Sequence, residues 1–362
     1  MRPIPRALTA VAGLSLLAGA LGPVAAADPA PPDAPVTLPA TVPSLTSWEA
    51  APGTWSMTSA TRVVGSEDLA RTRDLLASEL RAVTGEAVPT APQDPDAGDI
   101  SLSLDPDRLA ELGVEGYELR VSADGIAVTG ADARGVFYGT RTVGQMLRQQ
   151  RVLPAGSAVD VPRYAERGVT ACACQINIQG DWIDRLLTDM ADLKLNHLLL
   201  EMKLKSDRHP EANTWSYYTR ADVSRLVSRA RDLGIDVIPE INSPGHMGIW
   251  LENLPEYQLV DRDGRRHPEM LDLSNPRAVQ YYLDLVDEYD GVFTTRYWHM
   301  GADEYMIGTS PANFPALARW AEQTYGAGAT VNDAFIAFVN QVNAHVKARG
   351  KSLRMWNDGV VP

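Results

Sequence analysis

The pattern of apolar and polar positions changes at about residue 162. Before that point, two stretches carry apolar residues at helical spacing, and a short hairpin turns at Ala123-Asp124-Gly125. Two helices that pack against a small sheet predict an α+β domain over 44–162. The helices and strands expected in it are 67–83, 100–104, 117–121, 126–129 and 131–149.

After residue 162, apolar runs alternate regularly with amphipathic segments of helical spacing. Nearly continuous apolar runs are typical of parallel strands that are buried on both faces. Five strand-helix units of this kind are compatible with a doubly wound sheet or with a barrel. The expected strands are 169–176, 197–202, 235–241, 297–301 and 353–356, and the expected helices are 182–193, 221–233, 277–289 and 333–349.

Two observations favour the barrel. No G-x-G-x-x-G motif follows any of the strands, so a dinucleotide-binding sheet has no support. Polar residues gather at the carboxyl ends of the strands, where barrel enzymes place their sites. The expected fold class is therefore α/β, with about five of the eight units of a (β/α)8-type barrel over 163–362, preceded by the small α+β domain.

Residues 1–27 have the pattern of a secretory signal peptide, with a basic start, an apolar run over 7–21 and a small-residue cleavage site. A membrane anchor is the alternative, but the run is short and contains Gly, Ser and Thr. We expect a secreted protein with no membrane span after the leader is removed. The Pro- and Ala-rich residues 28–43 are expected to form a flexible or polyproline linker.

Composition narrows the class of protein. The chain has 362 residues, 45% of them hydrophobic, and a net charge of −13. Such a protein is unsuited to binding nucleic acid, whereas neutral glycans remain possible partners. Cys172 and Cys174 are too close for an unstrained disulfide, and no second pair completes a zinc site, so we expect buried apolar cysteines. The six histidines lack ligand spacing, and no metal or cofactor is expected.

Two adjacent carboxylates follow the fourth strand of the expected barrel. Asp303 and Glu304 cannot both ionise freely, so the pKa of one of them should be raised. A carboxyl group with a raised pKa is suited to protonating a glycosidic oxygen. The alternative is a solvated pair that caps the next helix, but the neighbouring Trp298, His299 and Gly301 argue against it.

The third strand also ends in polar residues. It supplies Glu240, Asn242 and His246 within seven positions, on a Pro-Gly turn that fixes their direction. His246 alone would be interpreted as an ordinary loop histidine. Together with Glu240 and the carboxylates after the fourth strand, it indicates a site at the carboxyl ends of the strands.

These segments resemble glycoside hydrolase family 20, the β-N-acetylhexosaminidases. HMGADE is similar to the H-x-G-G/A-D-E signature of that family, and PEINSPGH to its P-E-I-D-x-P-G-H segment. The family's R-G start, its K-L-N segment, its tryptophan-bearing fifth strand and the domain before its barrel are matched as well. HMGADE spans 299–304 and PEINSPGH spans 239–246. The R-G start lies at 167–168, the K-L-N segment at 194–196 and the tryptophan-bearing strand at 355–358. The domain before the barrel is matched at 116–119 and 135–139.

The resemblance implies substrate-assisted catalysis with retention, in which the 2-acetamido oxygen of the substrate is the nucleophile. Glu304 would protonate the leaving oxygen and then deprotonate the incoming water. Asp303 would orient the acetamido N–H and stabilise the oxazolinium cation. Arg167 would bind sugar hydroxyls, Trp356 would form a wall of the acetamido pocket, and His246 would support the carboxylates. The implied substrates are N-acetylhexosamine-containing oligosaccharides or chitin-type glycans.

The chain departs from the family pattern at three strand ends. Residues 171–174 stand where the family has an Asp, and Asn242 replaces another. The second strand ends in 201–207 instead of a His-x-x-Asp segment, so Glu201 or Asp207 could supply the missing carboxylate. These departures bear on substrate preference more than on the type of reaction.

Three functional hypotheses remain open. The first is a secreted exo-β-N-acetylhexosaminidase that releases terminal GlcNAc or GalNAc. The second is a catalytically incomplete fragment or a carbohydrate-binding remnant, because 163–362 offers 200 residues where a complete barrel typically needs about 250. The third is a related barrel glycosidase that releases a disaccharide.

Overall fold

The computed structural model describes residues 36–172, 176, 178–214, 217–306 and 308–358. Contacts between Cα atoms divide the chain into two units, Met1–Val36 and Thr37–Pro362, and every element described below belongs to the second unit. The signal peptide expected over 1–27 lies outside the described residues.

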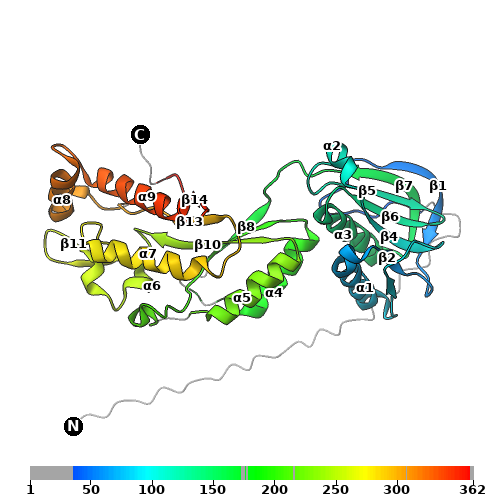
Figure 1. The fold of residues 1–362 in the computed structure, drawn as a ribbon, viewed down its shortest axis with the longest axis horizontal. Coiled ribbons are helices and arrows are strands. Elements are labelled where there is room, and N and C mark those ends of the chain that lie inside the picture. The colour runs from blue at the N-terminus through cyan, green and yellow to red at the C-terminus, as the bar shows by residue number, and fades with distance from the viewer. Residues whose placement is uncertain (1–35, 173–175, 177, 215–216, 307, 359–362) are drawn as a thin grey trace, which may run out of the picture. The chain divides into compact units, whose positions relative to one another are not determined.

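A seven-stranded mixed sheet forms the small domain. Its strand order is β1-β7-β5-β6-β4-β2-β3, and helices α1 and α3 pack side by side against it (Figure 1). The strands are β1 Glu49–Ser56, β2 Val63–Gly65, β3 Thr90–Ala91, β4 Asp99–Leu104, β5 Tyr117–Ser122, β6 Gly125–Gly130 and β7 Val152–Asp160. The helices are α1 Ala70–Thr84, α2 Leu109–Leu112 and α3 Ala133–Gln149, with 3-10 turns at Glu67–Leu69 and Pro106–Arg108. The expected helices, strand and hairpin are confirmed, and β1, β2, β3 and β7 are additional.

Helix α3 rests closely on the sheet. The Asp132 side chain accepts a hydrogen bond from the Gly135 amide and caps the helix. A methyl group at Gly139 would lie 2.3 Å from Cγ1 of Val128 in β6, so glycine is what permits this close approach.

The same helix binds the segment that precedes the domain. Gln145 of α3 accepts from the Val42 amide at 2.7 Å and donates to the Val42 carbonyl at 2.8 Å. The Gln150 side chain donates to the Thr37 carbonyl. Glutamine side chains thus hold the backbone of the expected linker at residues 37 and 42, whereas 28–35 lie outside the described residues.

A parallel sheet of five strands forms the second part of the chain, in the order β14-β13-β10-β9-β8. The order follows the chain and never reverses, as it would at the switch point of a doubly wound sheet, so the barrel architecture is confirmed. The strands are β8 Gly168–Cys172, β9 His197–Glu201, β10 Asp236–Ser243, β13 Tyr297–Gly301 and β14 Ser352–Arg354. The helices between them are α4 Gly180–Asp192, α5 Arg220–Asp232, α7 Pro276–Asp290 and α9 Val331–Lys347. All five expected strands and four expected helices are present.

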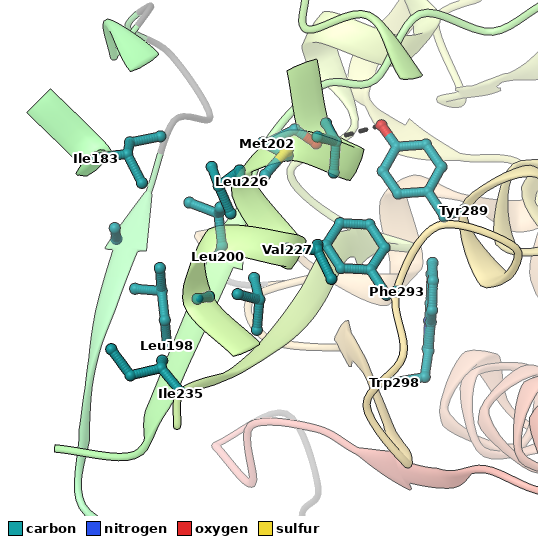
Figure 2. Close-up of a cluster of buried hydrophobic side chains, with 14 of the residues drawn as sticks. Ile183, Leu198, Leu200, Met202, Leu226, Val227, Ile235, Tyr289, Phe293 and Trp298 are labelled. Carbon is teal, nitrogen blue, oxygen red and sulfur yellow. Dashed lines mark hydrogen bonds between the residues drawn. The ribbon is translucent and has the colours of Figure 1, made fainter. Parts of the chain in front are cut away.

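Alternation along the strands decides which side chains meet the helices. In β9, Leu198 and Leu200 are fully buried and pack with residues such as Leu226 of α5 (Figure 2). Burying a leucine side chain contributes roughly 1.5–3 kcal/mol to stability. Leu199 and Glu201 occupy the alternate positions and line cavities on the other face of the sheet.

Further segments follow the carboxyl ends of β10 and β13. Helix α6 (Gly248–Leu251) and the hairpin of β11 (Gln258–Val260) and β12 (Arg266–Leu271) come after β10, and helix α8 (Pro315–Tyr325) comes after β13. Short 3-10 turns lie at Pro210–Ala212, Pro255–Tyr257 and Pro311–Asn313. None of these segments is among the expected elements.

Cys172 does not have the expected buried environment. It is exposed and disulfide-bonded, and Cys174 lies outside the described residues. The expectation of a buried apolar cysteine is therefore wrong for Cys172. The physical reason is its place at the carboxyl end of β8, where it lines a cavity instead of meeting the helices.

Candidate active site

Side chains at the carboxyl ends of the parallel strands form one layer. The register pairs Cys172 with Glu201, Glu201 with Glu240, and Glu240 with His299. Paired residues of a parallel sheet project to the same side, and the first three line one cavity of about 880 Å³. The cavity is lined by Thr170, Cys172, Glu201, Glu240, Asn242, His246, Gly248, Ile249, Glu252, Pro268, Glu269, Asp303 and Trp356.

The carboxylate of Asp303 is held in place by the neighbouring strand. Nδ2 of Asn242, in β10, donates a hydrogen bond to Oδ1 of Asp303 at 2.7 Å. Asn242 can approach because residue 301 is glycine, where a methyl group would lie 1.9 Å from the Asn242 Oδ1. The orientation of Asp303 is therefore fixed before any substrate binds.

One imidazole lies beside both adjacent carboxylates. Nε2 of His246 lies 3.5 Å from Oδ2 of Asp303 and 3.3 Å from Oε2 of Glu304. His246, Ala302 and Glu304 all have left-handed backbone conformations, with φ of 54°, 70° and 55°. Strained backbone of this kind persists where surrounding structure holds it, commonly at functional sites. The Glu304 side chain is about half exposed, so its carboxyl group remains accessible.

Trp356 stands at the wall of the same cavity. Its indole Nε1 donates to Oε1 of Glu240 at 3.0 Å, and its ring centroid lies 4.7 Å from that of His299. The Glu240 side chain is buried and also lies 3.2 Å from Nδ1 of His299. The indole therefore has a fixed orientation, with part of its apolar face open to the cavity.

The carboxyl group of Glu201 in this cavity has an altered pKa. Burial, and to a smaller extent the nearby charges of Glu240 and Asp303, raise its pKa to about 8. Oε2 of Glu201 lies 3.1 Å from Sγ of Cys172. At neutral pH the Glu201 carboxyl group is therefore protonated and can donate a hydrogen bond.

Both parts of the chain match models of one enzyme family. Residues 38–161 match the model described as glycosyl hydrolase family 20, domain 2, and residues 164–361 match the catalytic domain of the same family. The chain belongs to glycosyl hydrolase family 20. The recognition drawn from the HMGADE and PEINSPGH segments is thereby confirmed.

The family 20 chain is similar to two kinds of curated relative. It is 59% identical to the Lacto-N-biosidase of Bifidobacterium bifidum, a match that covers 91% of this chain and 30% of that protein. It is 26% identical to Beta-hexosaminidase subunit A1 of Dictyostelium discoideum, with 70% of this chain and 51% of that protein covered. The chain thus spans about a third to a half of the length of these relatives.

Solved family 20 structures share the fold. The GH20 β-N-acetylhexosaminidase of Streptomyces coelicolor A3(2) matches with a TM-score of 0.74 at 24% identity, over 88% of this chain and 66% of that chain. This likeness shows the architecture of a barrel preceded by a small domain.

The structure distinguishes the two candidates for the missing carboxylate of the family 20 pattern. Glu201 ends β9 and lines the cavity, as described above. Asp207 is 80% exposed and lies 3.7 Å from Lys205, and it does not line the cavity. The sequence indicated that the carboxylate lies at the end of this strand, but it did not distinguish Glu201 from Asp207. The direction of a side chain beyond the last paired residue of a strand depends on the loop that follows.

Arg167 does not line this cavity, and its expected sugar-binding role stays a prediction. It directly precedes β8, whereas the residues of this strand that line the cavity, Thr170 and Cys172, lie nearer its carboxyl end. Its guanidinium donates to the carbonyls of Lys194 and Tyr164 and to the carboxylate of Glu115. These contacts use Nε, Nη1 and Nη2, so the guanidinium is already engaged within the protein.

A wall that sequence reasoning did not foresee comes from the segments after β10. Glu252 and Glu269 line the cavity there, and the Glu269 carboxylate accepts from the Gly248 amide at 3.1 Å. The buried Lys203 donates to the carbonyl of Ile249 at 2.6 Å and so holds this wall. Burial lowers the pKa of Lys203 to about 8.

Among the residues that the structure describes, no group of three or more His, Cys, Asp or Glu side chains is arranged to hold a metal ion. Within the same ranges, no helix is long and apolar enough to cross a membrane.

Proposed function

We propose that this family 20 protein hydrolyses β-linked N-acetylhexosaminides by substrate-assisted catalysis with retention of configuration. The observation that carries the proposal is the approach of Asp303 and Glu304 to the single imidazole of His246, where His246 and Asp303 line the cavity and Glu304 lies next to them. Trp356 on the cavity wall offers an apolar face to the acetamido methyl group.

In the first step, the acetamido oxygen of the bound sugar attacks C1 while Glu304 gives its proton to the glycosidic oxygen. The bond between C1 and that oxygen breaks, and the aglycone leaves as an alcohol. The sugar becomes a cyclic oxazolinium cation. The Asp303 carboxylate, oriented by Asn242, accepts from the acetamido N–H and stabilises the positive charge.

In the second step, water attacks C1 from the face that the aglycone left, and the Glu304 carboxylate takes the proton of this water. The bond between C1 and the acetamido oxygen breaks, and the acetamide forms again. Each step inverts C1, so the product keeps the configuration of the substrate. His246 supports both carboxylates from its fixed position on the turn after β10.

The proposal is tested with the whole protein and an aryl β-N-acetylglucosaminide. We expect Glu304→Gln and Asp303→Asn to lower kcat/KM on the order of 100-fold or more. Asp207→Asn is the matched control, because it removes an exposed carboxylate outside the cavity and should leave activity unchanged. Wild-type turnover in Glu304→Gln would exclude Glu304 as the acid.

A second candidate function is the release of a disaccharide. It is favoured by the 59% identity to a Lacto-N-biosidase and by the cavity wall that carries Glu252 and Glu269. On this proposal the aryl lacto-N-bioside is cleaved with a kcat/KM at least tenfold higher than the aryl β-N-acetylglucosaminide. Equal or reversed preference would favour the monosaccharide-releasing activity.

We also infer that the protein is secreted, from the leader pattern of residues 1–27. Expression with the leader in a secreting host should yield a protein in the medium whose sequence begins at residue 28. An uncleaved protein in the membrane fraction would support the membrane anchor instead.

A further inference from the structure

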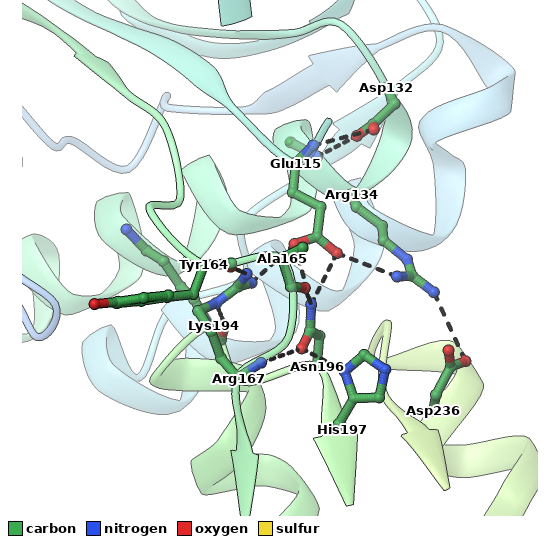
Figure 3. Close-up of polar contacts among 11 residues, drawn as sticks. Glu115, Asp132, Arg134, Tyr164, Ala165, Arg167, Lys194, Asn196, His197 and Asp236 are labelled. Carbon is green, nitrogen blue, oxygen red and sulfur yellow. Dashed lines mark hydrogen bonds and ion pairs between the residues drawn. The ribbon is translucent and has the colours of Figure 1, made fainter. Parts of the chain in front are cut away.

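A second group of polar side chains, most of them buried, lies where the small domain meets the amino ends of the parallel strands. We call Glu115, Arg134, Arg167, Lys194 and Asn196 the junction cluster (Figure 3). We propose that the junction cluster positions β8 and β9, and so sets where their carboxyl ends present Cys172 and Glu201 to the cavity. Only the kinetic part of this proposal rests on the proposed function.

Glu115 is the centre of the junction cluster. It is 4% exposed, and its carboxylate accepts from Arg134 at 3.1 Å, from Arg167 at 2.9 Å and from Asn196 at 3.2 Å. A buried carboxylate without such partners would be strongly destabilising. The Asp132 side chain accepts from the Glu115 amide and holds this residue from the side of the small domain.

Asn196 ties the starts of two strands together. It is 1% exposed and directly precedes β9. Its Oδ1 accepts from the Arg167 amide at 2.8 Å, and its Nδ2 donates to the Ala165 carbonyl at 2.8 Å and to Glu115. These contacts span the chain just before β8, so the amino ends of β8 and β9 are joined through one side chain.

Two further contacts extend the cluster. The buried ammonium group of Lys194 donates to the Tyr117 hydroxyl at 2.8 Å and to Asp160 at 3.0 Å, and both of these residues belong to the small domain. Arg134 lies 3.8 Å from Asp236, the first residue of β10. The small domain therefore contacts the starts of β8, β9 and β10 through charged side chains.

Left-handed backbone conformations are independent evidence that the geometry of the junction cluster is closely specified. Within the described ranges, five residues other than glycine have left-handed φ values. Three of them are the active-site residues named above, and the other two are Glu115 at 67° and Lys194 at 57°. Such strain is maintained only where surrounding contacts over-determine the backbone. Its restriction to the active site and the junction cluster indicates that both geometries are specified closely.

The strands transmit position from the cluster to the cavity. Arg167 directly precedes β8, which ends at Cys172, and Asn196 directly precedes β9, which ends at Glu201. Strand side chains alternate between faces, so a shift of the strand start by one residue would turn the cavity residues away. On this proposal the R-G and K-L-N segments position the strands from their amino ends, whereas the reaction takes place at the carboxyl ends.

The test uses Glu115→Gln in the whole protein, which keeps the shape of the side chain and removes its charge. We expect KM for the aryl substrate to rise about tenfold or more, because misplacement of cavity residues weakens productive binding. We expect kcat to fall less, because Asp303 and Glu304 lie beyond β13. Arg167→Lys, a milder change that cannot reproduce the three guanidinium contacts, should act in the same direction.

The matched control is Arg148→Met. It removes another ion pair between the two parts, Arg148 with Asp192 at 2.6 Å, which is solvent-exposed and touches no strand start. This variant should lose at most some thermal stability, with KM unchanged. If Glu115→Gln lowers the thermal midpoint but leaves KM as in the unmodified protein, the positioning role is overturned.

Hydrogen exchange supplies a readout that needs no activity. Glu115→Gln should speed amide exchange in 168–172 and 197–201, whereas Arg148→Met should not. If the unmodified protein fails to hydrolyse the substrate, the proposed function fails while this measurement still decides on the cluster. Unchanged exchange in both strands would overturn the positioning role.

Discussion

At the scale of single residues, the cavity combines carboxyl groups in different environments. Glu304 is about half exposed, and Asp303 is bound by an amide. Glu201 is more deeply placed, and its pKa is raised to about 8. Sequence reasoning named Glu201 as a candidate at this strand end but did not foresee its raised pKa, because burial of a side chain depends on the packing around it.

Glu201 should make stability depend on pH. Its folded-state pKa of about 8 exceeds the value of about 4.3 for an unfolded chain. Between these pH values the folded protein binds a proton that the unfolded chain has lost, so stability falls as pH rises. Glu201→Gln has no carboxyl group to titrate and so does not lose stability in this way. Its thermal midpoint minus that of the wild type should therefore increase from pH 4.5 to 8 and then stay constant.

Thermal melts across pH 4 to 9 check this prediction. Asp207→Asn serves as control, since its carboxylate is exposed and its midpoint should follow that of the wild type. A difference between Glu201→Gln and wild type that stays constant with pH would contradict the raised pKa.

Asn242 should be needed as a hydrogen-bond donor. In Asn242→Asp, a second carboxylate would lie about where Nδ2 now contacts Asp303 at 2.7 Å. Two carboxylates at that distance share a proton, and one pKa of the pair rises. We expect kcat/KM at neutral pH to fall about tenfold or more. A pH profile should show the loss growing as pH falls towards the raised pKa, whereas a uniform loss would point to misfolding.

At the scale of elements, the sequence predicted the strands whose own residues carry an apolar pattern and missed the strands that depend on a distant partner. The strands of the barrel part are short apolar runs, such as the one ending at Glu201, and the sequence alone indicates them. β1 (EAAPGTWS) and β7 (VLPAGSAVD) each contain Pro and Gly and lack alternation, yet they pair with one another. Their strand conformation is supplied by that distant partner, which no local pattern records.

The same reasoning separates the site residues. Asp303, Glu304, His246 and Trp356 follow strands directly, so the sequence could place them at the carboxyl ends. Arg167 stands just before its strand, and the local pattern does not tell which end of the barrel a flanking residue serves. The wall after β10 comes from a loop, whose path depends on packing across the cavity.

The end of β13 should be intolerant of any side chain at Gly301. Its φ is +69°, and a methyl group would meet the Asn242 side chain at 1.9 Å. Gly234, which follows α5, has a similar φ of +71° with open space around it. We expect Gly234→Ala to cost about 1 kcal/mol. Gly301→Ala should cost about 1 to 3 kcal/mol more, from overpacking.

Urea unfolding of the two glycine variants measures the difference directly. Because both residues have left-handed φ, the backbone contribution cancels and the contact with Asn242 remains. Equal losses in the two variants would show that the strand end relaxes away from Asn242. Activity should be lost in Gly301→Ala alone, since Asp303 depends on this contact.

At the scale of the whole molecule, charge is the property that bears on substrate choice. The chain carries a net charge of −13. Five carboxyl side chains line the cavity, and among its described lining residues there is no Lys or Arg. They are Glu201, Glu240, Glu252, Glu269 and Asp303. A cavity with this lining repels anionic ligands, and its walls concentrate the field.

If the proposed hydrolysis holds, a sulfated aryl β-N-acetylglucosaminide should be a poor substrate beside its neutral counterpart. At 10 mM salt the Debye length is about 30 Å, so both the cavity and the net charge act on the approaching anion. At 300 mM the distant charges are screened, and kcat/KM for the sulfated substrate should recover several-fold. The neutral substrate should show no such dependence.

Steady-state kinetics at the two salt concentrations, with Glu252→Gln beside the wild type, separate charge from shape. Removing one carboxylate from the wall should improve kcat/KM for the sulfated substrate at low salt and leave the neutral substrate unaffected. If the sulfated substrate is equally poor at both salt concentrations and in both proteins, its exclusion is steric. The cavity would then select by shape, and its carboxylates would serve to bind hydroxyl groups.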